Sequence, residues 1–362
     1  MLTKIELANI GPFDGSGVTI ELKPLTVVVG ANNVGKSTII YAYDVLSTGR
    51  IPSTKFNSYG NPLSLLYMQN ASNVGRILVT GAFNGKTTTR QVELSRSSAP
   101  IAERINGAIV ANGQLNSIPP VRITAGNLGA DHSTSLEMFH SFLENTVLLL
   151  SNREFIKQNM LVGSSTRTIS SDGSNIIQFL LERWTDRDDK WGEAESWLKK
   201  IDPQLTLLKT PLRNQIASIE TERSYPEGKT SINVSQQGSG IQRLIQIISA
   251  LVFSAENTLI IIEEPEMNLH KKAQEVLADL INKAVQSWKK QVIITTHSWD
   301  FLLPYMHDLE VLERARGNSI QIQKENFTLV ELLNENNKIT VKNDVSFKKF
   351  SDFKTEMKNI FG

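Results

Sequence analysis

The feature that most constrains this chain is a glycine-rich segment between an apolar run and a helical pattern. The run Leu25–Val29 is continuous and rich in β-branched residues, which is typical of a strand buried on both faces. The sequence GANNVGKST follows at 30–38, and a helical pattern continues over Thr38–Leu46. A G-x-x-x-x-G-K-S/T segment between a strand and a helix is the context that a phosphate-binding P-loop requires. The sequence therefore predicts an α/β fold with a nucleotide-binding turn.

The residue types of this segment suit a nucleoside triphosphate. Glycine lets the backbone approach the phosphates, and the amides of the turn and of the helix N-terminus supply positive partial charge. We expect Lys36 to reach the β- and γ-phosphates and the Ser37 hydroxyl to bind Mg²⁺. The alternative is a glycine turn with a solvated lysine, and the flanking strand and helix argue against it. The predicted ATP-binding residues here are Gly30, Asn32, Asn33, Val34, Gly35, Lys36, Ser37 and Thr38.

A second apolar run ends in paired carboxylates. Leu259–Ile262 is followed by Glu263, Glu264, Pro265 and Glu266. Carboxylates at the end of a buried strand can hold a metal ion and polarise water, so we expect Glu263 to bind Mg²⁺ and Glu264 to orient the attacking water. Taken alone, glutamates in this place would more often begin a solvated helix, where the helix dipole favours negative charge. The P-loop upstream favours the catalytic interpretation.

A third apolar run, Val292–Thr295, leads into Thr296, His297 and Ser298. A helical pattern over Leu269–Trp288 connects it to the preceding strand, so the two strands are expected to form a parallel βαβ unit. His297 should then lie at the same sheet edge as the carboxylates, where α/β sheets bind ligands. There it could donate a hydrogen bond to the γ-phosphate or to the catalytic water, and a structural histidine is the alternative.

A second glycine-rich turn, Gly238-Ser239-Gly240, opens a helix predicted over Gly240–Phe253. A helix start rich in glycine and serine presents free amides to an anion. The P-loop already serves the chain's own nucleotide, so this turn suggests the nucleotide of another subunit. A simple helix entry turn is the alternative.

The amino-acid composition excludes several classes of function and site for this chain. The chain has 362 residues, of which 40% are hydrophobic and 21% charged, and these are ordinary globular values. It has no cysteine, which excludes disulfides, thiolate metal sites and cysteine nucleophiles. The net charge of +1 indicates no general attraction to nucleic acid, whose binding would need a local basic groove. No apolar run could span a membrane and no signal-peptide core is present, so we expect a cytoplasmic protein without membrane contact.

The remaining patterns predict two hairpins near the N-terminus. Leu2–Ala8 and Val18–Leu22 alternate as a hairpin would, and residues 76–96 form another that turns at Asn84-Gly85. Residues 103–116 show no clear pattern. Further along, the patterns predict a helix over Ser135–Asn145, a strand over Thr146–Leu150, a mobile loop or linker over Gly163–Asn175, and helical structure over Ile176–Lys200 with Trp184, Trp191 and Trp197 in the core.

In order along the chain, the segments GANNVGKST, SQQGSGIQRL, LIIIEEPEMNLH and IITTHS resemble those of ABC-class ATPase heads. Among these, the chain is most similar to the OLD (overcoming lysogenization defect) family of the RecF/SMC clan, from Leu2 to about Ser298. The resemblance implies an ABC-ATPase head with a mixed, largely parallel central sheet, an N-terminal antiparallel β subdomain and an inserted helical subdomain. It implies a Walker A motif at Gly30–Thr38, a Walker B motif at Leu259–Glu264 with Glu264 catalytic, a D-loop over Glu266–His270, a switch histidine at His297 and a signature motif at Gly238–Gly240.

The same resemblance implies a domain plan and partners. It places one ATPase domain over 1–362, an inserted helical and β subdomain over 156–230, and a C-terminal extension of unknown role over 299–362. ATP and Mg²⁺ would lie between two heads, so a homodimer would be the smallest active unit. Arg153, at the end of the strand before the insertion, would lie near the nucleotide.

Relatives of this size are often ATPase subunits of prokaryotic anti-phage systems, so the resemblance implies an ATP-driven switch that gates a separate nuclease or toxin. The alternative is a DNA-binding repair ATPase similar to RecF. A transporter subunit is disfavoured, because 204 residues separate Lys36 from Gly240. Gly238 stands where many signature motifs have serine, and Glu263 replaces the more usual aspartate. These departures lead us to expect slow hydrolysis.

A nuclease in its own right is not predicted. OLD nucleases continue past the switch histidine into a metal-binding Toprim domain, whereas 65 residues follow His297 here. No buried strand leading into an acidic cluster is predicted among them, and the stretch Lys342–Lys358 is typical of a solvated helical face. Asp186-Arg187-Asp188 is interpreted as an exposed corner between helical stretches.

Overall fold

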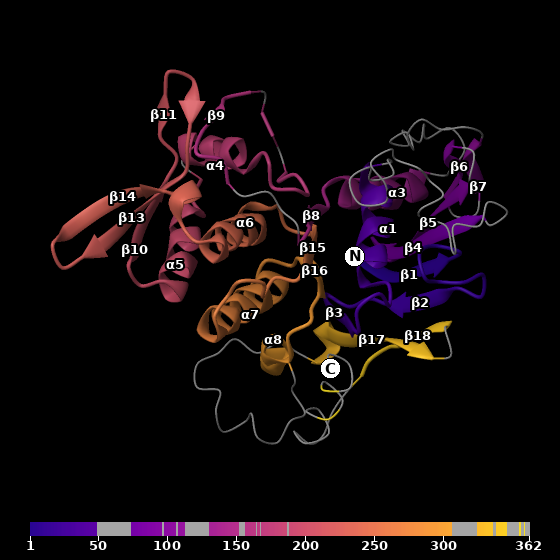
Figure 1. Cartoon of the computed structure of the whole chain (residues 1–362). Helices are drawn as coiled ribbons and strands as arrows, with labels where there is room; N and C mark the ends of the chain where they lie inside the picture. Colours follow the sequence, from indigo (N-terminus) through magenta and orange to yellow (C-terminus); the bar gives the residue numbers. More distant parts are fainter. Residues whose placement is uncertain are drawn as a thin grey trace. The chain divides into compact units, whose positions relative to one another are not determined.

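The computed structural model describes residues 1–48, 74–95, 98–105, 108–112, 130–151, 156–163, 165–166, 168–186, 188–305, 324–335, 338–345, 355 and 358. The chain divides into two compact units, whose helices and strands are labelled in Figure 1. The first unit holds the described residues up to Thr146 and those from 324 onward. The second holds those from Val147 to Tyr305.

An antiparallel sheet in the first unit has the strand order β2-β1-β4-β5-β6-β7 (Figure 1). Both predicted hairpins are confirmed by the antiparallel pairing of β1 with β2 and of β4 with β5. Asn84 and Gly85, where the sequence predicts the turn, have φ angles of 49° and 72°, and two positive values in succession suit a type I′ turn. The strands are β1 (Leu2–Ala8), β2 (Val18–Glu21), β4 (Gly75–Phe83), β5 (Lys86–Ser95), β6 (Ser98–Ile105) and β7 (Ala108–Asn112).

The P-loop strand β3 (Leu25–Gly30) is buried along its whole length, as the sequence predicts. It pairs in parallel with β17 (Phe327–Glu335), which in turn pairs antiparallel with β18 (Lys338–Lys342). The sequence did not predict these C-terminal strands, and Lys342 ends a strand rather than beginning a helical face. Strands β17 and β18 are therefore built into the sheet beside the P-loop strand.

Two helices of the first unit confirm the predicted helical patterns. Helix α1 (Lys36–Thr48) begins within the P-loop, and its residues 38–46 are buried. Helix α3 (Ala130–Glu144) packs against β4 through Phe139 and Phe142, whose rings meet Phe83 edge to face. The core of this unit thus lies between the antiparallel sheet and these helices.

The second unit contains the predicted βαβ unit. Strand β15 (Leu259–Glu263) pairs in parallel with β16 (Gln291–Thr295) and with β8 (Val147–Leu149), and all three are buried. Helix α7 (Lys271–Gln286) connects β15 to β16, and its N-cap is His270, whose Nδ1 accepts from the Ala273 amide at 3.2 Å. With the antiparallel N-terminal sheet, these parallel pairs confirm the predicted α/β class with a mixed, largely parallel sheet.

Residues 156–230 hold two helices and two small antiparallel sheets, ordered β10-β13-β14 and β11-β12-β9. The helical stretch predicted over Ile176–Lys200 is two helices. Trp191 and Trp197 are buried as expected, but Trp184 is 40% exposed, so its predicted core position is wrong. The elements are β9 (Met160–Leu161), α4 (Ile176–Thr185), α5 (Trp191–Ile201), β10 (Leu205–Lys209), β11 (Leu212–Arg213), β12 (Ile216–Ala217), β13 (Glu220–Tyr225) and β14 (Gly228–Asn233).

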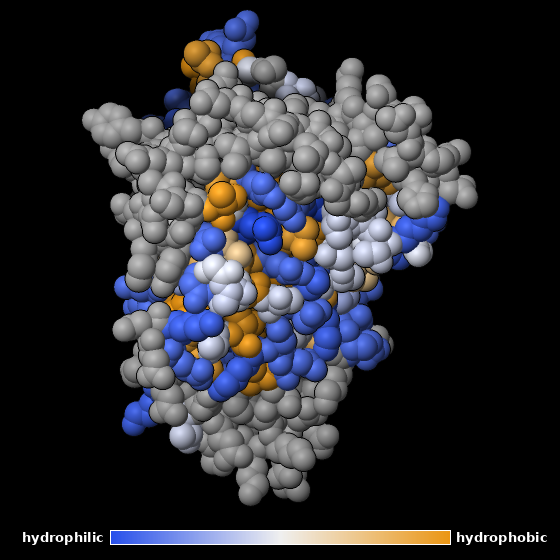
Figure 2. Space-filling view, turned by 90° about the vertical axis from the view of Figure 1, so that its right-hand side faces the viewer, coloured by the Kyte–Doolittle hydropathy of each residue, from blue (hydrophilic) through white to orange (hydrophobic). Residues whose placement is uncertain are grey.

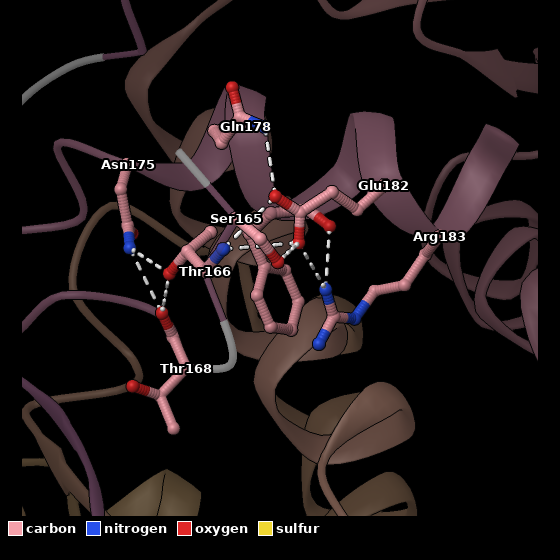
Figure 3. A network of polar contacts seen from close by, with 8 residues as sticks. Ser165, Thr166, Thr168, Asn175, Gln178, Glu182 and Arg183 are labelled. Atoms are coloured by element: carbon pink, nitrogen blue, oxygen red, sulfur yellow. Dashed lines mark hydrogen bonds and ion pairs between the residues drawn. The ribbon is translucent and has the colours of Figure 1, made fainter. Parts of the chain in front are cut away.

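The segment predicted as a mobile loop or linker over Gly163–Asn175 is irregular but fastened to α4 (Figure 3). The Glu182 carboxylate accepts hydrogen bonds from the Thr166 amide at 3.0 Å and from the Gln178 side chain at 2.8 Å. Asn175 Nδ2 donates to Thr166 Oγ1 and to the Thr168 carbonyl, both at 2.9 Å. The small polar residues described here are therefore held by hydrogen bonds and do not form an unattached linker.

The described residues contain no helix that is both long and apolar enough to cross a membrane. Figure 2 shows one face of the molecule, where hydrophobic side chains lie in small groups among hydrophilic ones. The coloured residues of this face thus form no single broad apolar area.

The buried carboxyl of Asp44 in α1 makes stability depend on pH. Burial raises the pKa of Asp44 to about 6, from an ordinary value of 3.8. The folded state therefore binds this proton more tightly than the unfolded state, and stability falls as pH rises from about 4 to about 6. We expect Asp44→Asn to be more stable than the wild type at pH 7.5 by up to about 3 kcal/mol, and equally stable at pH 3.5.

Urea unfolding of both proteins at the two pH values measures this difference. The exposed Asp189→Asn variant is the matched control and should show no pH-dependent gap. A wild type that is the more stable protein at pH 7.5 would show that the ionised Asp44 is stabilising.

Candidate nucleotide-binding and hydrolysis site

The predicted P-loop is a turn closed around the ammonium of Lys36. Its Nζ donates hydrogen bonds to the carbonyls of Gly30 and Ala31, both at 2.6 Å, and the residue is 7% exposed. Asn32 and Asn33 at the tip are exposed. The lysine side chain thus spans the turn from inside, with its charge held against backbone oxygens.

Position 35 requires glycine for two reasons: its backbone conformation and the lack of room for a side chain. Its φ angle is +102°, which side chains rarely adopt. A Cβ here would lie 2.7 Å from Phe13 Cζ and 2.8 Å from Pro12 Cγ. The N-terminal turn therefore packs directly onto the P-loop, and only glycine fits between them.

Helix α1 starts at Lys36, and its first closing bond runs from the Ile39 amide to the Gly35 carbonyl at 3.1 Å. Ser37 is partly exposed at this start, whereas Thr38 packs against Gly11. The first amides of a helix and its dipole favour an anion at this end. The turn and the helix start together can hold phosphate groups.

Glu263 ends β15 with its carboxylate held by Ser151. The residue is 3% exposed, and its Oε2 accepts from both the amide and the hydroxyl of Ser151, each at 2.8 Å. Ser151 lies just beyond β8, the parallel neighbour of β15. Ser151 was not among the predicted site residues, although a hydroxyl residue shortly after a buried strand is a usable signal.

A second missed residue, Arg243 of helix α6 (Ser239–Phe253), lies beside the same carboxylates. Its Nη2 donates to the Ser151 carbonyl at 2.7 Å. Burial lowers the pKa of Arg243, while attraction to Glu264 opposes that shift. Arg243 thus links the helix that begins at the second glycine turn to the serine that holds Glu263.

The structure brings Glu264 and His297 together. His297 Nε2 lies 3.3 Å from Glu264 Oε1, and the two side chains are 33% and 26% exposed. Glu264 has a φ angle of +47°, a left-handed conformation that is uncommon outside glycine, and its amide donates to the Thr295 carbonyl at 2.9 Å. This conformation turns the chain directly after Glu263, so two successive carboxylates have different surroundings.

The second glycine turn begins α6 with Gly238 as N-cap. Gly238 is exposed, and Ser239 and Gly240 are partly exposed. A Cβ on Gly240 would lie 2.5 Å from the Asn268 carbonyl oxygen, so glycine is needed for close packing on the segment after β15. Gln242 fastens the turn by donating from Nε2 to the Gln237 carbonyl at 2.9 Å.

The predicted site residues thus fall into two groups. The first unit holds the P-loop residues, and the second holds Glu263, Glu264 and His297 together with the turn Gly238–Gly240. Arg153 lies outside the described residues.

The Ser37 hydroxyl in the first unit and the Glu263 carboxylate in the second are each oxygen donors of the kind that Mg²⁺ prefers. The described residues contain no group of three or more histidine, cysteine, aspartate or glutamate side chains that could hold a metal ion. Mg²⁺ is commonly held by one or two carboxylates together with substrate phosphates, so a single buried carboxylate such as Glu263 suits it.

Family models match the two parts of the chain that carry these groups. Residues 2–62 match the P-loop containing region of AAA domains, and residues 137–302 match the AAA ATPase domain. Old nuclease of Escherichia phage P2 is 25% identical over 328 residues, which cover 78% of this chain and 54% of that protein. Endonuclease GajA of Bacillus cereus is 35% identical over 101 residues, which cover 23% of this chain and 15% of that protein. The chain thus spans about half the length of Old nuclease and much less of GajA.

Solved structures support the same fold. An Smc head bound to the C-winged helix domain of ScpA has a TM-score of 0.61 and 15% identity, covering 96% of this chain and 98% of that one. An Smc head with an extended coiled coil, bound to the C-terminal domain of ScpA derived from Pyrococcus furiosus, has a TM-score of 0.58 and 12% identity, covering 100% and 99%. The chain therefore carries the P-loop region and the ATPase domain of AAA proteins, has the fold of an Smc head, and is homologous to Old nuclease and endonuclease GajA.

Proposed function

We propose that this ATPase is a switch that joins two copies of the chain head to head around ATP and gates a separate effector. The observation that carries the proposal is the 3.3 Å contact between His297 Nε2 and Glu264 Oε1 at the ends of two parallel strands. It occurs in a chain that also forms a P-loop closed around Lys36. A carboxylate and an imidazole placed like this can orient a water and stabilise charge on a phosphate.

The binding residues have distinct roles in this proposal. Lys36 would exchange its bonds to the loop carbonyls for bonds to the β- and γ-phosphate oxygens. Ser37 and Glu263 would hold Mg²⁺, which neutralises phosphate charge when bound. Ser151, by bonding to Glu263 Oε2, limits the directions in which that carboxylate can point.

The hydrolytic step would use Glu264 and His297. Glu264 accepts a hydrogen bond from the attacking water and takes its proton as the oxygen bonds to the γ-phosphorus. The bond between the γ-phosphorus and the leaving ADP oxygen breaks, and His297 donates a hydrogen bond to the phosphoryl group that is transferred. Both side chains are partly exposed, so water can reach them.

The turn Gly238–Gly240 would complete the site of the second copy. It is accessible, begins a 15-residue helix and presents amides that suit an anion. Because the P-loop already supplies amides for the chain's own nucleotide, we assign this turn to the nucleotide held by the partner copy. ATP then favours the closed dimer, and its hydrolysis returns the open state.

The effector is proposed to be a nuclease. Old nuclease and endonuclease GajA, to which this chain is homologous, are nucleases by name. We infer that nucleotide-driven closing of the ATPase dimer controls such an activity in a separate protein, in a prokaryotic anti-phage role.

Ser239→Arg tests the dimer by placing a bulky side chain in the second glycine turn, away from the P-loop residues. With a slowly hydrolysed ATP analogue, light scattering should report a doubled mass for the wild type and a monomer for the variant. Fluorescent ATP should bind both proteins with affinities within about threefold, because each copy keeps its own P-loop.

Ser231→Arg on the exposed strand β14 is the matched control and should dimerise like the wild type. An effector nuclease should co-purify with the wild type in a nucleotide-dependent way. Dimers of unchanged stability in Ser239→Arg would contradict the assignment of this turn.

A further inference from the structure

A third carboxylate, Glu266, bonds to the segment that carries His297. Glu266 Oε1 accepts hydrogen bonds from Thr296 Oγ1 at 2.6 Å and from the His297 amide at 2.9 Å. Glu266 Oε2 is buried and has no hydrogen-bond partner among the described residues. In the sequence, Glu266 is the third glutamate after the strand and the first residue of the D-loop that the family resemblance implies.

These bonds determine where the backbone of His297 lies. Thr296 is fully buried, and its hydroxyl also accepts from the Ser298 amide at 3.0 Å. One carboxylate oxygen therefore holds a hydroxyl and an amide that are 30 and 31 residues away in the chain. With the backbone held in this way, the imidazole of His297 lies 3.3 Å from Glu264.

The electrostatic setting indicates that Glu266 acts as an acceptor rather than as a charge. Burial raises the pKa of Glu266 and the nearby Glu264 raises it further, while the bonds from Thr296 and His297 lower it. Both groups that bond to Oε1 are uncharged donors. A neutral amide oxygen in the same place would accept the same two bonds.

The segment of Glu266 also reaches the second glycine turn. Asn268, two residues further on, presents its carbonyl so close to Gly240 that a Cβ there would lie 2.5 Å from the oxygen. One short stretch thus touches the start of α6 at one residue and the His297 segment at another.

We propose that Glu266 is a positioning residue for His297, holding the Thr296–His297 backbone so that the imidazole faces Glu264. This inference rests on the proposed function of His297 and Glu264. Glu266 touches neither the nucleotide nor the water in this scheme. Because a displacement of about 1 Å at a catalytic group can lower a rate by about 100-fold, losing the two bonds should slow turnover without weakening ATP binding.

A double-mutant cycle with rescue tests this. Steady-state ATP hydrolysis is measured for Glu266→Ala, Glu266→Gln, His297→Ala and the Glu266→Ala/His297→Ala double variant, together with the thermal unfolding of each.

We expect Glu266→Ala to lower kcat by about 10-fold or more with KM within about twofold. Glu266→Gln should restore kcat to within about threefold of the wild type, since its amide oxygen accepts both bonds. The double variant should be no slower than His297→Ala alone, because the two residues act as one unit.

Thr296→Val provides a second route that leaves Glu266 in place. It removes the hydroxyl's bonds to Glu266 and to the Ser298 amide with little change of volume, and we expect a several-fold lower kcat that disappears in the His297→Ala background. If Glu266→Ala does not fold, the kcat of Thr296→Val still tests whether the bond to Glu266 positions His297.

Different outcomes would contradict the positioning role of Glu266 and the proposed catalytic role of His297. If His297→Ala is slow but Glu266→Ala and Thr296→Val turn over like the wild type, Glu266 does not position His297. Losses that add to that of His297→Ala, or that follow the unfolding temperature, would likewise make Glu266 a structural residue only. If His297→Ala itself turns over like the wild type, the proposed role of His297 is wrong instead.

Discussion

Glu264→Gln is expected to lower the rate of ATP hydrolysis by about 10³-fold while leaving ATP binding within about threefold of the wild type. Removing a general base typically costs 10²- to about 10⁴-fold in rate, and glutamine keeps the size of the side chain but cannot take a proton. Glu264 Oε1 lies 3.3 Å from His297 Nε2, a distance at which the amide can still be accommodated. Single-turnover hydrolysis and fluorescent ATP titration measure the two quantities separately.

The dimer should accumulate in this variant. If hydrolysis reopens the ATP-bound pair, Glu264→Gln with ordinary ATP should give the doubled mass that the wild type shows only with a slowly hydrolysed analogue. Glu275→Gln on the exposed face of α7 is the matched control, and it should hydrolyse ATP at the wild-type rate. Hydrolysis by Glu264→Gln at the unmutated rate would mean that another group orients the water.

Lys36→Ala is expected to weaken ATP binding by about 100-fold and to abolish measurable turnover. A hydrogen bond to a charged group contributes about 1.5–3 kcal/mol, and the ammonium is proposed to reach two phosphates. The substitution also removes the bonds from Nζ to the carbonyls of Gly30 and Ala31, so the empty P-loop should lose order as well. Fluorescent ATP titration measures the first effect, and amide hydrogen exchange over residues 30–38 the second.

Lys272→Ala, on the exposed start of α7, is the control for this loss of charge and should bind ATP like the wild type. Thermal unfolding without nucleotide separates a loosened P-loop from a misfolded protein. Wild-type affinity in Lys36→Ala would show that the phosphates are held elsewhere.

Much of the fold could be predicted because its patterns are local. The continuous apolar runs that became β3, β15 and β16 are short and β-rich, and the 3.6-residue period of α6 and α7 is visible in their own sequences. The turn at Asn84-Gly85 was equally predictable, since two positive φ angles in succession favour these residue types. In each case the cause lies within a few residues of the effect.

Other elements could not be predicted in this way. Strand β17 is the parallel neighbour of β3 although about 300 residues separate them, and most of the strand is buried in this sheet. The composition of Gly163–Asn175 predicted a mobile loop or linker, whereas the Thr166 amide in this segment donates to Glu182 in the following helix. Trp184 follows the apolar period of α4 but is at its last turn, where a large side chain meets solvent.

The sequence by itself determined the chemistry available to this protein: a lysine in a glycine turn, two carboxylates and a histidine, each directly after a buried strand. Only the tertiary structure decided which groups hold them in place. Ser151 lies 112 residues from Glu263, Arg243 lies 92 residues from Ser151, and Glu266 lies 31 residues from the His297 amide that it binds. Hydrogen bonds act over about 3 Å regardless of separation along the chain, so these partners are set by how strands and helices pack and not by any local pattern.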